Sequence, residues 1–211
     1  VALATRMLPV ADGSDMMGSL RNPAAWNAVY GFRPSWGLVP HDAPGDRFMA
    51  TLATEGPMGR TVEDIARLLS VIGRPDPAVP FGREAQDYAA ALAHRAPRPR
   101  IGWLADWGGA YAMEPGILAL CEDALGRMQD ELGAEIIRLE PPMEAEDLWT
   151  AWMRLRAFLN ANGRAALWED PALRAQLKPE MHWEIEQGRD LTTAQLYEAS
   201  VIRTRWHIRL A

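Results

Sequence analysis

Apolar residues recur at helical spacing in several parts of the chain. The clearest repeat lies between Thr61 and Gly73, with apolar side chains at Val62, Ile65, Ala66, Leu69 and Ile72. Thr61, with Asp64 three residues later, resembles a capping box, and Gly73 is typical of a helix end. The pattern predicts a helix that follows Thr61 and ends before Gly73.

A strand, a loop and a short helix are predicted near the start of the sequence. The apolar run Met7–Ala11 predicts a buried strand that ends where a cluster of glycine and aspartate begins. A loop is expected over 13–21. A short helix then follows, with Asn22 as its cap, Pro23 at its first helical position and Gly31 at its end.

The middle of the chain alternates between irregular and regular patterns. Prolines and glycines over Phe32–Pro57 and Pro75–Pro99 predict loops, with one helix near Glu84–His94. A strand–helix–strand unit is then predicted at Ile101–Leu104, Pro115–Leu132 and Glu135–Leu139, with Gly133 closing the helix. A unit of this length implies parallel strands and a right-handed crossover.

The last third of the chain is predicted to be helical. Leu148, Trp152, Leu155 and Leu159 form one stripe that ends at Gly163, and Thr192–Ala211 forms a last helix. Four of the nine tryptophans fall within helical patterns and are assigned to the core: Trp149, Trp152, Trp168 and Trp183.

Composition narrows the function classes. A formal net charge of -6 argues against nucleic acid or an anionic membrane as a partner. The single cysteine, Cys121, permits no intrachain disulfide and is interpreted as a buried apolar residue. No apolar run approaches the ~18 residues that span a bilayer, so a cytoplasmic protein is expected. Surface or helix-packing positions are assigned to the histidines, His41, His94, His182 and His207.

Both ends of the chain are interpreted as cut. The chain starts at Val1 and enters an apolar stretch without a helix cap, and the predicted last helix has no stop signal. We therefore expect a part of a larger domain.

One short segment combines residues suited to nucleophilic catalysis. Between the predicted first strand and first helix, a glycine-bearing loop carries Ser19. Backbone N–H groups converge in such loops, as an oxyanion hole requires. Strand-to-helix turns with glycine and serine are common, so this pattern alone does not establish a nucleophile.

Two ordered blocks resemble the amidase-signature family. The first, Val10–Pro40, reads VADGSDMMGSLRNPAAWNAVYGFRPSWGLVP, and resembles the family pattern G-[ST]-D-x-G-G-S-[IL]-R-x-P-A followed by G-[LF]-[KR]-P. The second, Glu55–Ile72, reads EGPMGRTVEDIARLLSVI, and resembles the family's G-P-[ML]-x-R-[ST]-V-x-D-x-A segment. Two blocks in this order are far more specific than one motif.

The resemblance implies a role for each residue of the loop. Ser19 corresponds to the nucleophile, and the backbone N–H groups of Met16, Met17, Gly18 and Ser19 to the oxyanion hole. Asp15 and Arg21 correspond to supporting residues that hold the loop, the alternative being a surface ion pair worth under about 1 kcal/mol. Met17 stands where the family often has glycine, which could restrict the loop because glycine alone enters positive φ freely.

The resemblance also implies a mechanism. In the family, a lysine and a relay serine with a cis peptide bond activate the nucleophile, which forms an acyl-enzyme that water hydrolyses. Both groups precede the nucleophile in the family, and residues 1–18 contain no lysine. Lys178 is the only lysine and lies far downstream, and Ser14 is too close to Ser19 to match the relay position. The chain alone is therefore expected to be inactive.

The resemblance implies an α/β fold, the amidase-signature α/β/α arrangement with a mixed, largely parallel central sheet covered by helices. We expect 1–211 to form a partial domain, with a signature core at 1–74, an excursion and strand–helix–strand unit at 75–143 and a helical region at 144–211. A small-molecule amide is the expected partner. No cofactor or metal is expected, and a homodimer of the full-length parent is left open.

Two alternatives remain open. One is the A subunit of a transfer-RNA-dependent amidotransferase, although Leu20-Arg21-Asn22-Pro23 and the Met16-Met17 pair look unlike that subfamily. The other is a noncatalytic remnant of an amidase.

Overall fold

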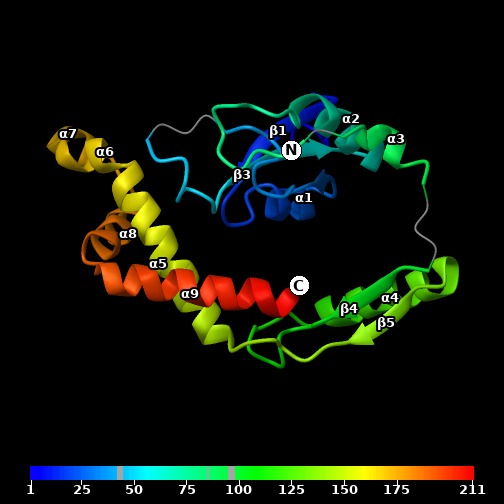
Figure 1. Ribbon diagram of the computed structural model, residues 1–211. Helices are drawn as coiled ribbons and strands as arrows, with labels where there is room; N and C mark the ends of the chain where they lie inside the picture. Colours follow the sequence, from blue (N-terminus) through cyan, green and yellow to red (C-terminus); the bar gives the residue numbers. More distant parts are fainter. Residues whose placement is uncertain (42–44, 85, 95–97) are drawn as a thin grey trace. The chain divides into compact units, whose positions relative to one another are not determined.

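The computed structural model describes residues 1–41, 45–84, 86–94 and 98–211 (Figure 1). The chain divides into two units, Val1–Arg95 and Ala96–Ala211. The division falls inside the predicted segment 75–143. The described part of the proline-rich excursion therefore belongs largely to the first unit, and the strand–helix–strand part belongs to the second.

The first unit is built on a three-stranded antiparallel sheet with strand order β1-β3-β2. The strands are β1 (Val10–Asp15), β2 (Tyr30–Gly31) and β3 (Thr54–Gly59). Gly13 pairs with Gly56, and Asp15 pairs with Thr54. The sheet thus joins the two blocks of the family resemblance, because β1 comes from the first block and β3 extends into the second.

The predicted first strand is displaced in the structure. Met7 and Leu8 are exposed, and β1 continues through the polar cluster that was predicted to be a turn. The strand β3 was missed, because it lies at the end of the stretch predicted as irregular and contains Gly56 and Pro57. Both strands are held by backbone pairing with each other, which their side-chain patterns do not reveal.

The middle strand tolerates Pro57 because the backbone polar groups of this residue point toward β2 and not toward β1. Its carbonyl accepts a hydrogen bond from the Phe32 N–H at 3.0 Å, on the side of the sheet occupied by β2. In an extended strand the N–H and C=O of one residue point to the same side. The missing N–H of Pro57 therefore falls on that side and leaves the β1–β3 ladder intact.

Helix α1 (Arg21–Trp26) starts earlier than predicted and ends earlier. Leu20, not Asn22, is its N-cap residue, and its N–H donates to the Asp15 carboxylate at 3.3 Å. At the other end, the Asn27 side chain donates to the Pro23 carbonyl at 2.8 Å, and Gly31 lies in β2. The Asp15 carboxylate, five residues before Leu20, thus satisfies the N–H group of the N-cap residue.

Helix α2 (Val62–Ile72) confirms the prediction made from its repeat and caps. The Thr61 hydroxyl accepts from the Asp64 N–H at 3.1 Å, and Ile65, Ala66 and Leu69 are buried. In the excursion, α3 spans only Tyr88–Ala91, shorter than the predicted helix.

Leu20 is the fully buried anchor between α1 and the sheet. A Cβ at Gly56 would lie 2.9 Å from the Leu20 side chain and 2.3 Å from the Phe32 carbonyl oxygen. A Cβ at Gly13 would lie 3.2 Å from the Leu20 side chain, and one at Gly31 would lie 2.3 Å from its carbonyl oxygen. Leu20 therefore packs where all three strands carry glycine.

The second unit begins with the predicted parallel pair. Strands β4 (Arg100–Trp103) and β5 (Glu135–Arg138) are parallel and are joined through α4 (Ile117–Leu132). Gly133 ends the helix in the left-handed region, at φ 65°, and its N–H donates to the Gln129 carbonyl at 3.0 Å. The strand–helix–strand prediction is confirmed.

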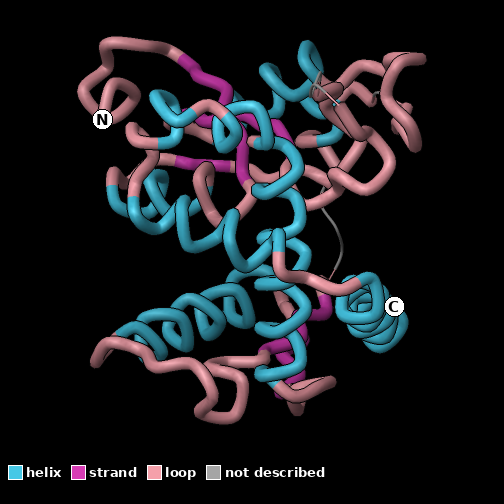
Figure 2. Tube along the Cα trace, turned by 90° about the vertical axis from the view of Figure 1, so that its left-hand side faces the viewer, coloured by secondary structure: helices cyan, strands magenta, loops and turns pink. Residues whose placement is uncertain are grey.

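Helices form the rest of the second unit, and the chain ends in one of them (Figure 2). They are α5 (Ala145–Gly163), α6 (Ala165–Glu169), α7 (Pro171–Arg174), α8 (Pro179–Arg189) and α9 (Thr193–Leu210). Helix α5 packs on α8 and α9. A Cβ at Gly188 of α8 would lie 2.1 Å from the Ala157 carbonyl oxygen of α5, so these helices approach closely. Across the described residues, none of the helices has the length and apolar character needed to cross a membrane.

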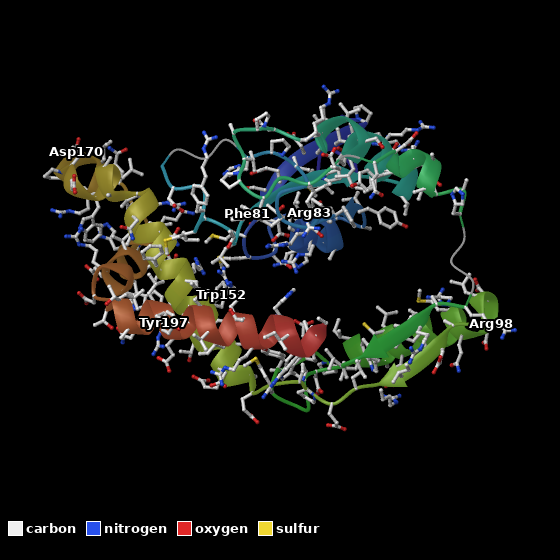
Figure 3. All side chains as sticks on the ribbon, viewed as in Figure 1. Phe81, Arg83, Arg98, Trp152, Asp170 and Tyr197 are labelled. Atoms are coloured by element: carbon white, nitrogen blue, oxygen red, sulfur yellow. The ribbon has the colours of Figure 1, made fainter. Side chains whose placement is uncertain are left out.

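Small side chains lie at the closest point of this helix contact. Ala151, Ala157 and Ala161 are buried on α5, whereas Trp149 and Trp183 are 55% and 48% exposed, so the core prediction is wrong for these two tryptophans. Trp152 and Trp168 are half-buried, as is Cys121. The Arg156 guanidinium carbon lies over the Trp152 ring, 5.0 Å from the ring centre. Figure 3 labels Trp152 on α5.

A polar network crosses the same helix contact. Glu184 of α8 is buried and accepts hydrogen bonds from Arg156 and Asn160 of α5. Arg164 donates to the Asn160 side chain at 2.5 Å. A buried carboxyl group without such partners is destabilising, so the network links α8 to α5.

We expect Gly56→Ala to destabilise the first unit by about 2 kcal/mol or more, because the new Cβ would meet the backbone oxygen of Phe32 and the Leu20 side chain. Native-state hydrogen exchange of the β3 amides measures this unit separately. Gly126→Ala is the control, since a Cβ there meets nothing within 4 Å and a helical alanine stabilises by about 0.5–1 kcal/mol. Unchanged β3 protection in Gly56→Ala would contradict the packing described for Leu20.

Candidate active site

The serine loop, residues 16–20, connects β1 to α1. Its side chains alternate in environment: Met17 and Ser19 are exposed, whereas Gly18 and Leu20 are buried. Ser19 is therefore presented to solvent by a loop whose neighbouring residues are fixed in the interior. An exposed hydroxyl on a fixed loop is the arrangement that a nucleophile requires.

Gly18 gives the loop its shape. It has φ 100°, and a Cβ there would lie 2.7 to 2.9 Å from atoms of the Asn22 side chain. The backbone conformation favours glycine, and a larger residue would also require the exposed Asn22 side chain to move. Met17 is not among the residues with positive φ, so the methionine that replaces a family glycine introduces no strain of this kind.

The Asp15 carboxylate organises the serine loop. It is 0% exposed and accepts hydrogen bonds from the Gly18 N–H at 2.7 Å and the Leu20 N–H at 3.3 Å. Arg21 adds two more, from Nε at 2.9 Å and Nη2 at 3.1 Å. The alternative of a surface ion pair is wrong for Asp15, although Arg21 itself is 54% exposed.

Arg33 is a further partner that the sequence interpretation missed. Its Nη1 donates to the Asp15 main-chain oxygen at 2.6 Å and to Oδ1 at 3.0 Å, and its Nη2 donates to the Leu52 carbonyl at 2.7 Å. The available signal was the family pattern itself, since Arg33 occupies the [KR] position of G-[LF]-[KR]-P. Two arginines thus face one buried carboxylate.

These contacts set the ionisation of Asp15. Burial by itself raises the pKa of the carboxyl, but the hydrogen bonds from Arg21, Gly18, Arg33 and Leu20 outweigh it and hold the pKa well below its usual range. Asp15 is therefore ionised at neutral pH and acts as a fixed negative charge that positions donors, not as an acid or base.

The backbone donors around Ser19 differ in availability. The Gly18 N–H is already engaged by Asp15. Within the described part of the chain, the N–H groups of Met16, Met17 and Ser19 have no hydrogen-bond acceptor. Of the four residues predicted to supply oxyanion donors, three therefore have an unengaged N–H group, and Gly18 shapes the loop.

Other residues weighed from the sequence lie elsewhere. Lys178 is the N-cap residue of α8 in the second unit, and Ser14 lies within β1. His182 contacts the Arg174 carbonyl at 2.9 Å, as expected of a packing histidine. Over the residues that the structure describes, no three histidine, cysteine or acidic side chains are grouped so that they could hold a metal ion.

We expect Asp15→Asn to lower the free energy of unfolding of the first unit by about 2–4 kcal/mol, because it removes the charge that both arginines face and leaves an amide NH2 opposite N–H donors. Hydrogen exchange of the β3 amides measures the loss. Asp12→Asn, an exposed change in the same strand, should stay within about 0.5 kcal/mol. Equal losses in the two variants would argue against this role for Asp15.

The low pKa of Asp15 also predicts a pH dependence. Its stabilisation is complete above the unfolded-state pKa, near ~3.9, and is lost as pH falls below that value toward the native pKa. The difference in unfolding free energy between the wild type and Asp15→Asn should therefore shrink between about pH 5 and pH 2. Urea denaturation at several pH values tests this, and a constant difference would contradict it.

Comparison with known proteins identifies the family. The amidase family profile matches residues 1–210. An acylamidase of Rhodococcus erythropolis is 35% identical over 153 residues, which cover 71% of this chain and 31% of the relative. The A subunit of the glutamyl-tRNA(Gln) amidotransferase of Synechococcus sp. (strain JA-3-3Ab) is 38% identical over 143 residues, covering 67% and 28%.

Solved structures agree over almost the whole chain. A bacterial aryl acylamidase of the amidase-signature family matches with a TM-score of 0.89 and 28% identity, covering 99% of this chain and 44% of that one. The 6-aminohexanoate cyclic dimer hydrolase matches with a TM-score of 0.80 at 21% identity, which supports the fold alone. The chain therefore spans less than half the length of these relatives and has the predicted α/β fold class. It belongs to the amidase-signature family.

Proposed function

We propose that the protein carrying this segment is an amide hydrolase that acts through an acyl-enzyme on Ser19. The observation that carries the proposal is the serine loop, where an exposed Ser19 lies between buried Gly18 and Leu20, both of which donate to one buried carboxylate. Family membership supports the reaction class. The matches to an acylamidase and an aryl acylamidase favour an acyl or aryl amide as substrate.

The proposed chemistry proceeds in two steps. Ser19 Oγ attacks the amide carbonyl carbon, its proton passes to the leaving amine, and the C–N bond breaks to give an ester on Ser19. Water then attacks the ester carbonyl, which releases the carboxylic acid and restores the hydroxyl. The N–H groups of Met16, Met17 and Ser19 are the proposed donors to the oxyanion that forms in each step.

The proposed reaction needs a general base to activate Ser19, and residues 1–18 do not provide the lysine that the family places before the nucleophile. The family resemblance implies a lysine and a relay serine before the nucleophile, and residues 1–18 contain no lysine. We therefore propose that residues 1–211 alone do not turn over. The coding region upstream of Val1 should encode both groups, and sequencing it tests this directly.

The nucleophile is tested in the protein that includes this upstream region. Ser19→Ala should lower kcat for an aryl amide by about 10⁴-fold or more, because the acyl-enzyme can no longer form. Mass spectrometry should detect the acyl adduct on the wild type and not on the variant. Ser14→Ala, on the same segment but within β1, should keep its activity.

Two results would contradict this assignment. One is full activity in Ser19→Ala. The other is ordinary turnover by residues 1–211 alone that Ser19→Ala abolishes, because the base would then lie within this chain.

A second function is favoured by one observation, the identity of 38% to the A subunit of an amidotransferase. In that case the protein would transfer ammonia to a misacylated transfer RNA together with partner subunits. Hydrolysis of simple aryl amides by the purified protein without partners would favour the hydrolase.

A further inference from the structure

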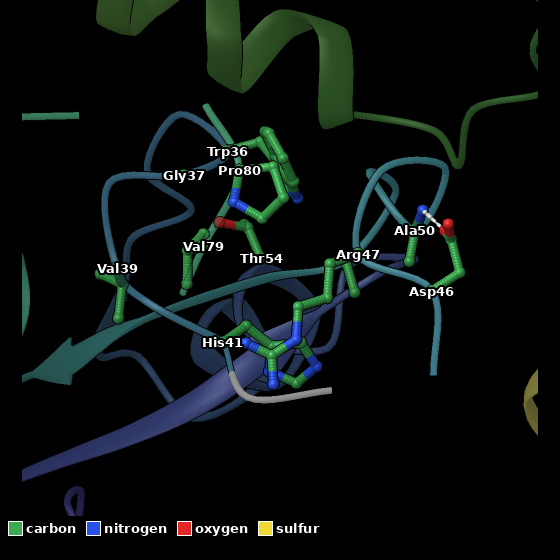
Figure 4. A pocket seen from close by; sticks show the side chains of 11 residues that line it. Trp36, Gly37, Val39, His41, Asp46, Arg47, Ala50, Thr54, Val79 and Pro80 are labelled. Atoms are coloured by element: carbon green, nitrogen blue, oxygen red, sulfur yellow. Dashed lines mark hydrogen bonds between the residues drawn. The ribbon is translucent and has the colours of Figure 1, made fainter. Parts of the chain in front are cut away.

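A small cavity lies in the first unit, beside the end of β3 (Figure 4). Its volume is about 20 Å³, and its lining includes the apolar side chains of Trp36, Val39, Val79 and Pro80. None of the residues assigned to the serine loop lines it. A cavity needs roughly 10–15 Å³ to hold one water molecule, so this cavity has room for one group of that size.

The cavity contains one buried hydroxyl without a partner. Thr54 is 3% exposed, and within the described residues its Oγ1 makes no hydrogen bond. Figure 4 shows this hydroxyl directed toward Val79 and Pro80, into the cavity. A buried hydroxyl left unpaired costs about 1–3 kcal/mol, which a bound polar group would offset.

The charged side chains around the cavity already have partners. His41 Nδ1 lies 2.8 Å from Glu55 Oε1, and Arg47 donates to the Ala78 carbonyl at 2.9 Å. The Asp46 carboxylate accepts from the Ala50 N–H at 3.1 Å, the bond dashed in Figure 4. Since these side chains already make hydrogen bonds, the unpaired Thr54 hydroxyl is the group left to bind a ligand, and a neutral hydroxyl suits an uncharged hydrogen-bonding group.

We propose that this cavity is a binding subsite for one small uncharged hydrogen-bonding group, with Thr54 Oγ1 as its anchor. Solvent water fits this description, and so does the NH2 or C=O end of a small amide. The amide source rests on the proposed amide hydrolysis, whereas the water source does not.

The subsite lies next to Asp15, the residue whose carboxylate holds the serine loop. Thr54 pairs with Asp15 across the β1–β3 ladder. Arg33 spans the same point, since one of its nitrogens donates to Asp15 and another to the carbonyl of Leu52, two residues before Thr54. A group bound at Thr54 therefore stabilises the end of the sheet from which the serine loop departs.

A crystal structure of residues 1–211 that resolves ordered water tests occupancy. Density within hydrogen-bond distance of Thr54 Oγ1 is expected. Thr54→Val keeps the shape but removes the hydroxyl, so it should lower the folding equilibrium constant of the first unit by about tenfold, measured by hydrogen exchange of the β3 amides. Thr54→Ser keeps the hydroxyl and should retain the bound group.

An empty wild-type cavity together with stronger β3 protection in Thr54→Val would overturn the proposal, because the hydroxyl would then be unpaired and its removal favourable. Crystals equilibrated with acetamide distinguish the two sources: an amide end at Thr54 supports amide recognition, and retained water supports a solvent site. The Ser19→Ala experiment measures turnover, whereas the crystal structure measures occupancy of the Thr54 cavity. If one of the two proposals fails, the other can therefore still be tested.

Discussion

The Asp15 carboxylate carries a negative charge with no exposure to water, and the first unit is arranged so that this charge is satisfied. Its donors come from the serine loop, the N-cap of α1 and two arginines. A buried charge tolerates the loss of few partners, so each donor is held where the carboxylate requires it. The end of β1, the turn at Gly18 and the start of α1 are therefore one structural feature, and the exposure of Ser19 follows from it.

The elements that could be predicted from the sequence are those whose defining residues lie within or directly beside them. Helix α2 has both a 3.6-residue repeat and a Thr61 cap, and α4 ends at a glycine with positive φ, so spacing and end signals suffice. Strands β1 and β3 carry glycine, proline and aspartate, and depend on each other's backbones across about 40 residues. The family pattern located the serine loop, but the unpaired hydroxyl of Thr54 depends on packing that only the structure reveals.

The second unit shows why an aromatic stripe can mislead. Gly188 lets α8 approach the backbone of α5 at Ala157, where a Cβ on residue 188 would lie 2.1 Å from the carbonyl oxygen. The helices pack through alanines and through the Glu184 network, while Trp149 and Trp183 face solvent. Helical spacing indicated the helices correctly, but it did not show which of their apolar residues are buried in the contact.

Leu20 packs against Gly13 and Gly56, which pair across β1 and β3. This contact distinguishes the sequence positions near Ser19 that tolerate substitution from those that do not. Gly56 is the more constrained strand position, because a Cβ there would meet the Phe32 carbonyl oxygen and the Leu20 side chain, whereas one at Gly13 would press on Leu20 at 3.2 Å. Met17 has neither positive φ nor burial. Sequence drift can therefore vary Met17 on the exposed side of the loop while Gly56 beneath Leu20 stays glycine.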